Sequence, residues 1–326
     1  MRARFPVRVL TAQVPADGTF FAPAIVEIPS LAVLEREVFG PILHVLRYRR
    51  AELGALVSAL NGLGYGLTLG IHSRIDETID YIVARARVGN VYVNRNMIGA
   101  VVGVQPFGGE GLSGTGPKAG GPLYVERLRR AATATLDLGL LGATVGAAPP
   151  LPALAALRGW AEAEGRGALA RRCDEYARIT PLAWRFELPG PTGESNRETL
   201  HPRGRAYCQA AALQDLLEQL AAAFATGNRV VLTASGMRLL PPSLARALGA
   251  EIDAGDAAEV DVALASDEAA AADLRRALAA RAGKRVRVVT PVGGAYPLHW
   301  LVVERAVSVN TAAAGGNATL MTLDPA

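Results

Sequence analysis

The regular alternation of strand-like and helix-like segments is the feature that most constrains the fold of this 326-residue chain. Residues 51–63 place Leu53, Leu56, Val57 and Leu60 on one helical face, and apolar segments that resemble strands precede and follow them. Because strand, helix and strand in succession are typical of parallel pairing, the first part of the chain predicts an α/β layer.

The second helical segment in this part, residues 73–90, shows where its ends are expected. Isoleucines recur at helical spacing, Asp76 is a candidate N-cap, and Gly89 occupies the place of a C-terminal glycine. The following segment, Asn90–Asn94, is strand-like again.

A second α/β rhythm begins near residue 181, after a stretch rich in small residues and proline. We therefore expect four parts: residues 1–130 as one α/β region, 131–180 as linker and helices, 181–300 as a Rossmann-like domain, and 301–326 as a C-terminal strand and motif. In the third part, Asp267 is the expected cap of the last helix.

Composition excludes several classes of function. The net charge is only +4, and no basic stripe is interleaved with aromatic residues, so nucleic-acid binding is not expected. Two cysteines and four scattered histidines show no metal-ligand spacing. No run of about 18 apolar residues predicts a transmembrane helix. A reduced, cytoplasmic protein is the simplest expectation.

The most unusual stretch is the glycine-rich segment from Asn94 to Gly121, which carries Phe107 but no histidine, cysteine or aspartate. Glycines allow successive backbone N–H groups to converge on a carboxylate, and an aromatic ring beside them can wall in an apolar ligand body. A phosphate-binding loop is an alternative, although the P-loop motif is absent. A purely structural turn is the third reading.

A second candidate is the segment Leu34–Leu43. Glu35 and Glu37 flank Arg36, which is typical of a solvated charged face, but Phe39 follows in a Phe-Gly-Pro turn. A carboxylate beside a rigidly held ring also suits the ribose hydroxyls and the base of a nucleotide.

No nucleophile–base pair is visible in the sequence. Cys173 follows Arg171 and Arg172, which would acidify a thiol, but its helical context favours a packing role. Cys208 is typical of a strand interior. No catalytic residue and no metal ligand is therefore predicted.

These motifs resemble the aldehyde dehydrogenase superfamily: "EREVFGP" at 35–41, "GNVYVN" at 89–94, and the glycine-rich segment. The wording of the last, with the tail "ERAVSVNTAAAGGNATLMTL", resembles one branch, the L-glutamate γ-semialdehyde dehydrogenase module of proline utilization A proteins. That resemblance implies NAD⁺-dependent oxidation of L-glutamate γ-semialdehyde to glutamate. It assigns the following roles: Glu37 to the nicotinamide ribose, Phe39 to the nicotinamide ring, Gly99 and Ala100 to the substrate carboxylate, and Phe107 to the aldehyde tunnel.

The departures from that family are as informative. Its nucleophilic cysteine, general-base glutamate and oxyanion-hole asparagine would all precede the first motif, as would the flavin (FAD) domain for proline oxidation. The resemblance thus implies a partial aldehyde dehydrogenase catalytic domain that is inactive alone and that associates with the missing N-terminal part or forms oligomers. Association of the full-length protein with the membrane periphery is a further expectation.

The middle of the chain resembles a degenerate copy of the family's early sequence. Thr233-Ala234-Ser235 stands where a cofactor-binding lysine is expected, which implies a Rossmann-like domain without a cofactor site. The alternative function is that of a non-catalytic, dehydrogenase-like lid or oligomerisation module acting on a partner chain.

Overall fold

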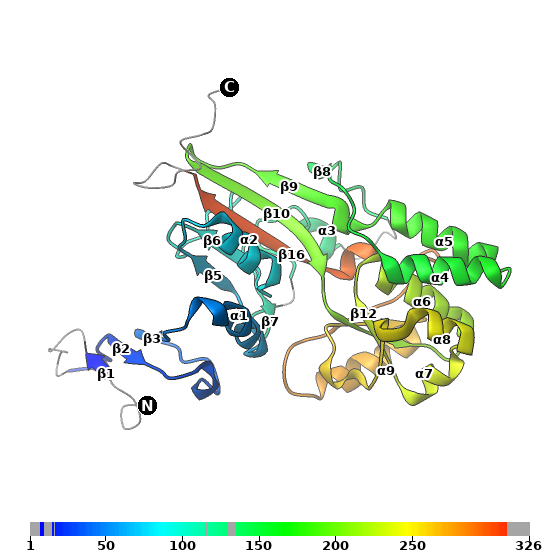
Figure 1. Ribbon diagram of the computed structural model, residues 1–326, viewed down its shortest axis with the longest axis horizontal. Coiled ribbons are helices and arrows are strands. Elements are labelled where there is room, and N and C mark those ends of the chain that lie inside the picture. The colour runs from blue at the N-terminus through cyan, green and yellow to red at the C-terminus, as the bar shows by residue number, and fades with distance from the viewer. Residues whose placement is uncertain (1–6, 10–14, 16, 115, 130–134, 312–326) are drawn as a thin grey trace. The chain divides into compact units, whose positions relative to one another are not determined.

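The computed structural model describes residues 7–9, 15, 17–114, 116–129 and 135–311 (Figure 1). Its contacts divide the chain into two units. The first contains Met1–Tyr65 and Asp80–Arg87, and the second contains Gly66–Ile79 and Val88–Ala326. The part of the expected C-terminal motif beyond residue 311 lies outside the described residues.

The first unit contains a three-stranded sheet and a helix. The order is β1-β2-β3, with β1 antiparallel to β2 and β2 parallel to β3. The Asn61 side chain accepts a hydrogen bond from Arg87 N (2.8 Å) and donates one to Arg85 O (2.9 Å). The elements are β1 (Val7–Val9), β2 (Ala24–Glu27), η1 (Leu31–Val33), β3 (Ile42–Val45), η2 (Arg50–Glu52) and α1 (Leu53–Gly62), and β4 (Tyr65–Gly66) lies at the boundary.

Both ends predicted for the second helix are wrong. Helix α2 (Asp76–Arg85) begins at Asp76, so this residue is already helical and is not the N-cap. The helix ends at Arg85, four residues before Gly89, whose N–H donates to Gly66 O (3.0 Å) as the chain enters β6. Gly89 does not end a helix, and its missing side chain allows the backbone of Gly108 to approach closely.

The second unit is built on a six-stranded sheet of order β5-β6-β16-β10-β9-β8 (Figure 1). β5 and β6 are parallel, β6 is parallel to β16, and β16, β10, β9 and β8 follow in antiparallel pairs. This sheet joins strands from all four parts that the sequence predicted as separate. The strands are β5 (Thr68–Ile71), β6 (Asn90–Val93), β8 (Ala143–Val145), β9 (Trp184–Leu188), β10 (Glu194–Pro202) and β16 (Val302–Asn310); the short β7 (Glu110–Gly111) and α3 (Tyr124–Leu128) lie outside it.

A second, all-parallel sheet of order β13-β12-β11-β14-β15 confirms the predicted Rossmann-like arrangement. Its largest core cluster packs α4, α5, α6 and α8 against one face, while α9 covers the other. The elements are α4 (Pro152–Ala163), α5 (Gly167–Arg178), η3 (Pro181–Ala183), β11 (Arg205–Gln209), α6 (Leu213–Ala225), β12 (Arg229–Leu232), α7 (Ala234–Leu239), α8 (Pro242–Leu248), η4 (Gly249–Glu251), β13 (Ile252–Ala254), η5 (Ala257–Glu259), β14 (Val262–Ala265), α9 (Glu268–Ala279), β15 (Arg287–Val289) and η6 (Leu298–Trp300).

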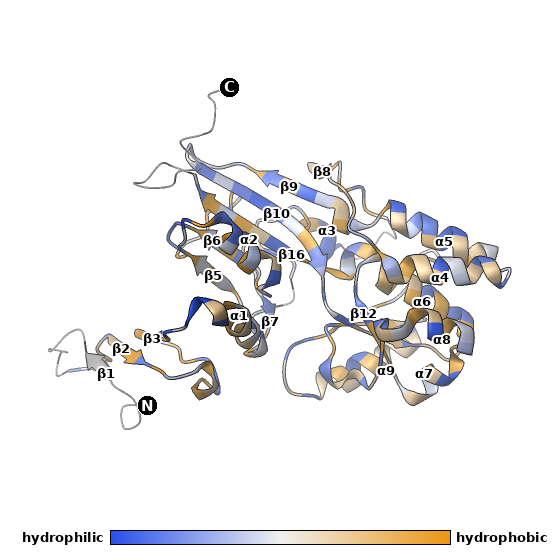
Figure 2. Cartoon of the chain, viewed as in Figure 1, coloured by the Kyte–Doolittle hydropathy of each residue, from blue (hydrophilic) through white to orange (hydrophobic). Residues whose placement is uncertain are grey.

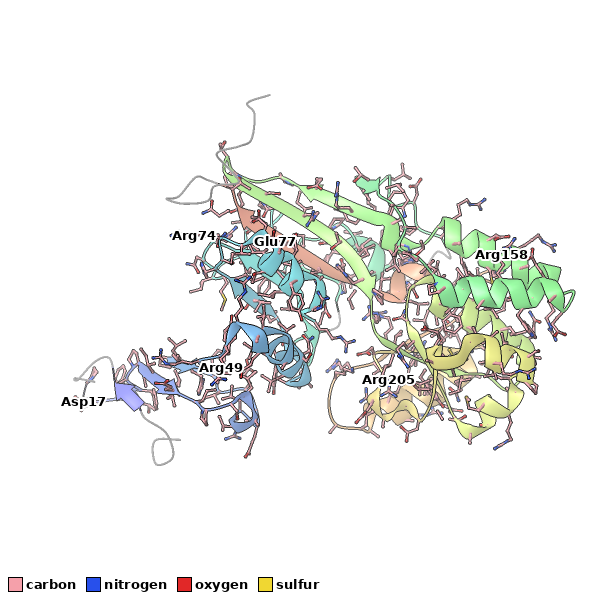
Figure 3. The ribbon with its side chains drawn as sticks, in the orientation of Figure 1. Asp17, Arg49, Arg74, Glu77, Arg158 and Arg205 are labelled. Atoms are coloured by element: carbon pink, nitrogen blue, oxygen red, sulfur yellow. The ribbon has the colours of Figure 1, made fainter. Side chains whose placement is uncertain are left out.

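Local signals explain several of these boundaries. Asp267 caps α9 as predicted, since its side chain accepts a hydrogen bond from Ala270 N (2.8 Å). Pro242 opens α8. On the solvent side of α4, Arg158 forms ion pairs with Glu162 and Asp174 (Figure 3).

Strand β10 is hydrophilic along most of its length (Figure 2). Its alternate residues Asn196, Glu198 and Leu200 are nevertheless buried. The central sheet therefore carries polar side chains on its covered face. Within the described ranges, no helix is both long and apolar enough to cross a membrane.

Candidate functional site

The glycine-rich loop leaves the central sheet at Asn94, directly after β6. Asn94 has a positive φ of 54°, and its side chain brackets Ser73 by accepting from Ser73 N (3.0 Å) and donating to Ser73 O (2.9 Å). Asparagine tolerates this left-handed conformation better than most residues. The start of the loop is therefore fixed by a local backbone constraint.

The predicted carboxylate anchor lies in the first turn of this loop. Ile98 N donates to the Asn96 side chain (2.8 Å), and Gly99 has a φ of +79° with open space beside it. Within the described part of the chain, the N–H groups of Gly99 and Ala100 donate no hydrogen bond. Two consecutive donors are thus available to an outside acceptor, which is what the carboxylate interpretation requires.

Phe107, the predicted tunnel wall, lies in the second half of the loop. Its backbone forms a two-way bridge with Ala119, with Phe107 N to Ala119 O at 3.0 Å and Ala119 N to Phe107 O at 2.9 Å. Its ring remains 37% exposed. The backbone is held while the ring is accessible, as expected for a side chain that contacts a ligand.

The β10–β16 pair holds the loop through residues that the sequence did not single out. The Glu194 carboxylate accepts hydrogen bonds from the Arg95 guanidinium and the Gln105 amide. Arg95 also donates to Ser308 Oγ (2.8 Å), and Gln105 accepts from Val101 N (2.8 Å). Glu194 lies about one hundred residues from its partners, so no sequence pattern indicates this contact.

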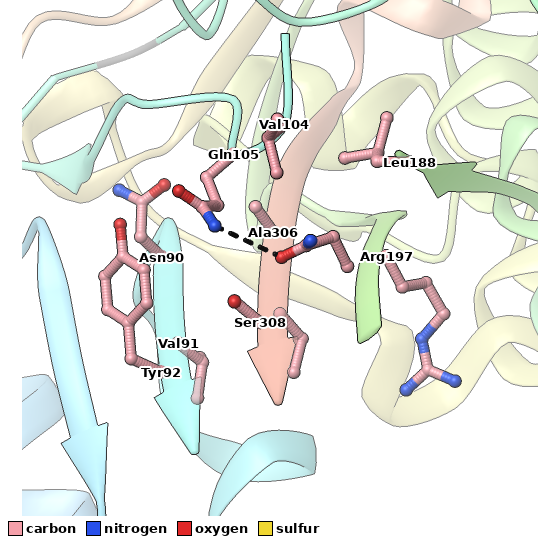
Figure 4. Close-up of a pocket in the computed structure, with 11 residues that line it drawn as sticks. Asn90, Val91, Tyr92, Val104, Gln105, Leu188, Arg197, Ala306 and Ser308 are labelled. Atoms are coloured by element: carbon pink, nitrogen blue, oxygen red, sulfur yellow. Dashed lines mark hydrogen bonds between the residues drawn. The ribbon is translucent and has the colours of Figure 1, made fainter. Parts of the chain in front are cut away.

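A small cavity separates the loop from the sheet (Figure 4). Its volume is about 10 Å³, which is room for one water molecule. The dashed line in Figure 4 marks the hydrogen bond from Gln105 Nε2 to Asn196 Oδ1 (3.4 Å) that crosses it. Burial raises the pKa of Tyr92, which also lines this space, so its hydroxyl stays neutral. The cavity is too small for an organic ligand, and the exposed side of the loop is the candidate site.

Glu37 and Phe39 belong to the first unit. They follow η1, and Gly40, with a φ of +121°, turns the chain into β3. Glu37 is exposed, and the Phe39 ring is 92% exposed. The structure therefore groups Gly99, Ala100 and Phe107 in one loop and Glu37 and Phe39 in one turn of the other unit.

The Rossmann-like sheet offers a second place to look for a ligand, at the carboxyl ends of β11 and β14. There, the buried Tyr296 donates from Oη to Ala265 O (2.9 Å), and its N–H donates to Tyr176 Oη (2.7 Å). Thr233, at the position of the expected lysine, caps α7 by accepting from Gly236 N (3.2 Å). Tyr296 thus lies at the carboxyl ends of the strands, and Thr233 takes part in a helix cap.

Neither cysteine is placed to act as a nucleophile. Cys173 on α5 and Cys208 on β11 are buried in the core of the Rossmann-like region. Burial raises the pKa of Cys173 to about 12 and that of Cys208 further. The described residues also contain no cluster of three or more metal-ligating side chains.

Comparison with known proteins gives a consistent result. Residues 6–133 match the aldehyde dehydrogenase family. The chain is 43% identical to the bifunctional protein PutA of Rhizobium meliloti, covering 94% of this chain and 26% of that protein. It is 46% identical to the PutA of Escherichia coli (strain K12), covering 94% and 24%. The chain thus spans about a quarter of the length of these curated relatives.

Two further likenesses differ in extent. A 1-pyrroline-5-carboxylate dehydrogenase of Geobacillus kaustophilus (strain HTA426) is 37% identical, over 34% of this chain and 21% of that protein. The solved structure of proline utilization A from Corynebacterium freiburgense matches with a TM-score of 0.62 at 22% identity, over 96% of this chain and 30% of that one. This structural likeness confirms the α/β fold.

Proposed function

We propose that this chain, whose residues 6–133 match the aldehyde dehydrogenase family, is the C-terminal part of a proline-catabolic, NAD⁺-dependent L-glutamate γ-semialdehyde dehydrogenase. The observation that carries the proposal is the pair of unengaged N–H groups at Gly99 and Ala100, in the same loop as the accessible ring of Phe107.

The chemistry of the loop suits the substrate. A carboxylate accepts strong hydrogen bonds from backbone N–H groups, and the Arg95 guanidinium is already engaged by Glu194. The N–H groups of Gly99 and Ala100 bind the substrate α-carboxylate. Phe107 contacts the aliphatic carbons and orients the aldehyde away from the anchor.

The first unit contributes to the cofactor site. Glu37 makes no hydrogen bond or ion pair with the described residues, so both carboxylate oxygens are available to ribose hydroxyls. The exposed face of Phe39 is suited to packing beside the nicotinamide ring. When bound, NAD⁺ accepts the hydride in the oxidation of the aldehyde.

The chain supplies binding groups and no nucleophile, because both of its cysteines are buried with raised pKa values. We therefore expect no dehydrogenase activity from the isolated chain. The nucleophile and its base come from a part of the enzyme that the chain does not contain, as its quarter-length coverage of the relatives suggests.

A non-catalytic lid or oligomerisation module is the second candidate. It is favoured by apolar side chains on the exposed side of the loop: Met97, Ile98, Val101 and Val102 are 47%, 79%, 55% and 87% exposed. Such side chains are suited to cover by another protein surface. The two candidates differ in whether the loop binds the substrate carboxylate.

A chimera tests the proposal. This chain replaces the matching C-terminal segment of the E. coli relative, and NADH formation from L-glutamate γ-semialdehyde is measured. We expect turnover by the chimera and none by the isolated chain. Gly99→Ala strains a left-handed residue, which costs about 1–2 kcal/mol, and should raise the KM for the aldehyde about tenfold or more.

Gly142→Ala is the matched control, because Gly142 has a φ of +85° and equally open surroundings outside the loop. Its KM should stay at the unmodified value. Equal KM values for Gly99→Ala and Gly142→Ala would contradict the carboxylate anchor and favour the lid. Turnover by the isolated chain would contradict the assignment of the nucleophile to a missing part.

A further inference from the structure

Lys118 is buried behind the glycine-rich loop, with 2% of its surface exposed. All three protons of its ammonium group have acceptors: Gly89 O at 2.6 Å, Gly108 O at 2.6 Å and Asn90 Oδ1 at 3.1 Å. Gly89 and Asn90 lie at the start of β6, and Gly108 directly follows Phe107. One side chain thus connects the stem of the loop to the central sheet.

The backbone is shaped to allow this connection. A Cβ atom on Gly89 would lie 1.9 Å from Gly108 O and 2.8 Å from Lys118 Nζ, so only glycine fits there. The Asn90 amide also donates to Gly108 O (3.0 Å). Together with the bridge to Ala119, these contacts hold the backbone of Phe107 from both sides.

Two buried acidic side chains come from neighbouring strands of the central sheet. Glu198 on β10 and Glu304 on β16 are 0% and 4% exposed, and their oxygens accept no hydrogen bond from the described residues. Burial lowers the pKa of Lys118, and the fields of Glu198, Glu304 and Glu110 oppose that change. Unpaired buried carboxylates are strongly unfavourable, so buried cations are expected nearby.

Two more charges face the same cluster. The distance from Arg127 Nη1 on α3 to Glu304 Oε2 is 3.6 Å. Arg305 on β16 carries the same charge as Lys118 and lowers the pKa of Lys118. Burial likewise raises the pKa of Glu198, while Lys118 and Arg127 oppose that change. Lys118 contacts Gly89, Asn90 and Gly108 directly, while Arg305 donates to Val88 O (3.2 Å) and to Glu110 Oε1 (3.5 Å).

The identity of the cation is informative as well. Only two of the 34 basic residues are lysines, Lys118 and Lys284, and the rest are arginines. A compact ammonium can approach three closely spaced acceptors, whereas a planar guanidinium cannot. The acceptors on Gly89, Asn90 and Gly108 therefore account for a lysine, and not an arginine, at position 118.

We propose that Lys118 is a positioning residue for the glycine-rich loop, because its ammonium group ties Gly108, next to Phe107, to the start of β6. Glu198 on β10 and Glu304 on β16, both in the central sheet, favour the charged form of its ammonium group through their fields. The proposal rests on the proposed function for the identity of the ligand, whereas the order of the loop is measurable without any ligand.

Amide hydrogen exchange on the full chain tests the positioning role. Lys118→Met should accelerate exchange at Phe107 and Ala119 at least tenfold, because it removes three hydrogen bonds from the loop stem, and should leave the β11 amides unchanged. Lys284→Met is the matched control and should change neither. Unchanged exchange at Phe107, or equal acceleration in β11, would overturn the proposal.

Nitrogen NMR of lysine-labelled chain tests the electrostatic part, since only two Nζ signals exist. We expect burial to place the pKa of the Lys118 ammonium below the ordinary lysine range, and the Ala119 amide signal to change with the same midpoint. Glu198→Gln removes the carboxyl group whose field raises the pKa of Lys118, and should lower both midpoints together. Independence of the two midpoints, or no response to Glu198→Gln, would refute it. Failure of the chimera to turn over aldehyde would refute the proposed function alone.

Discussion

Replacing Gly89 by alanine should be the most damaging single-methyl change in the central sheet. The added Cβ would lie 1.9 Å from Gly108 O, well inside van der Waals contact, and 2.8 Å from Lys118 Nζ. Gly108 O is a backbone atom held by hydrogen bonds from Lys118 and the Asn90 side chain. Neither neighbour can move aside without losing those bonds.

The magnitude follows from two contributions. Forcing a methyl group into a packed site costs about 1–3 kcal/mol. Displacing Gly108 leaves a buried carbonyl and part of a buried ammonium without partners, which adds about 1–3 kcal/mol for each lost bond. The sum is about 3–9 kcal/mol, at the severe end for a point substitution.

Urea denaturation followed by circular dichroism measures the change, and Gly159→Ala provides the contrast. Gly159 lies within α4 with open space beside it, so alanine there should stabilise the chain by about 1 kcal/mol through helix propensity. If the free energy of unfolding of Gly89→Ala stays within about 1 kcal/mol of that of the unmodified chain, Gly89 and Gly108 do not approach closely in solution. That result would also contradict the positioning role of Lys118.

Three other changes have definite outcomes. Burial lowers the pKa values of His201 and His299 to about 3, so below pH 6.5 the unfolded chain binds more protons than the folded chain. The free energy of unfolding should therefore decrease as the pH is lowered, by up to about 1.4 kcal/mol per pH unit for each histidine. Urea midpoints at pH 7 and pH 5 measure this decrease, which glutamine at both positions should remove. Asp267→Ala should cost about 1 kcal/mol, measured the same way, because it removes a helix cap. Glu194→Ala should accelerate amide exchange around Gln105, whose side chain loses its acceptor, and unchanged exchange would show that this contact does not hold the loop.

The sequence predicted the elements whose signals are local. The helix over residues 51–63 appears as α1 because its apolar residues recur at helical spacing. Asp267 was identified as a cap because an aspartate before a helical pattern accepts the first free N–H. The Rossmann-like region was predictable for the same reason, since its parallel strands are short apolar runs between such helices.

Strand β10 was not predicted, for a physical reason. A half-covered strand normally shows alternating apolar residues, but β10 places Asn196 and Glu198 at its inward positions, and only Leu200 gives the expected signal. Asn196 accepts a hydrogen bond from Gln105, and the positive charges of Lys118 and Arg127 favour the ionised form of Glu198. A strand with polar inward positions can be identified only when the tertiary contacts of those positions are known.

The same limit applies to the site. Glycine density predicted free backbone donors, and the N–H groups of Gly99 and Ala100 are indeed without partners among the described residues. Their role toward a carboxylate stays a prediction, as do the roles of Glu37, Phe39 and Phe107. Gly89 was misread as a helix end because its constraint comes from Gly108, a tertiary neighbour.

The polar face of β10 connects the central sheet to the glycine-rich loop. Glu194 holds the start and the middle of the loop, while Glu198, with Glu304 on β16, lies opposite the lysine that holds its end. Replacing these acidic residues with apolar ones would give β10 an ordinary strand pattern, but it would remove two of the three acidic groups whose fields favour the charged form of Lys118. A cover that only excluded water would be free to adopt such apolar residues. The carboxylates on β10 and β16 therefore indicate that this region acts on the loop by electrostatics as well as by shape.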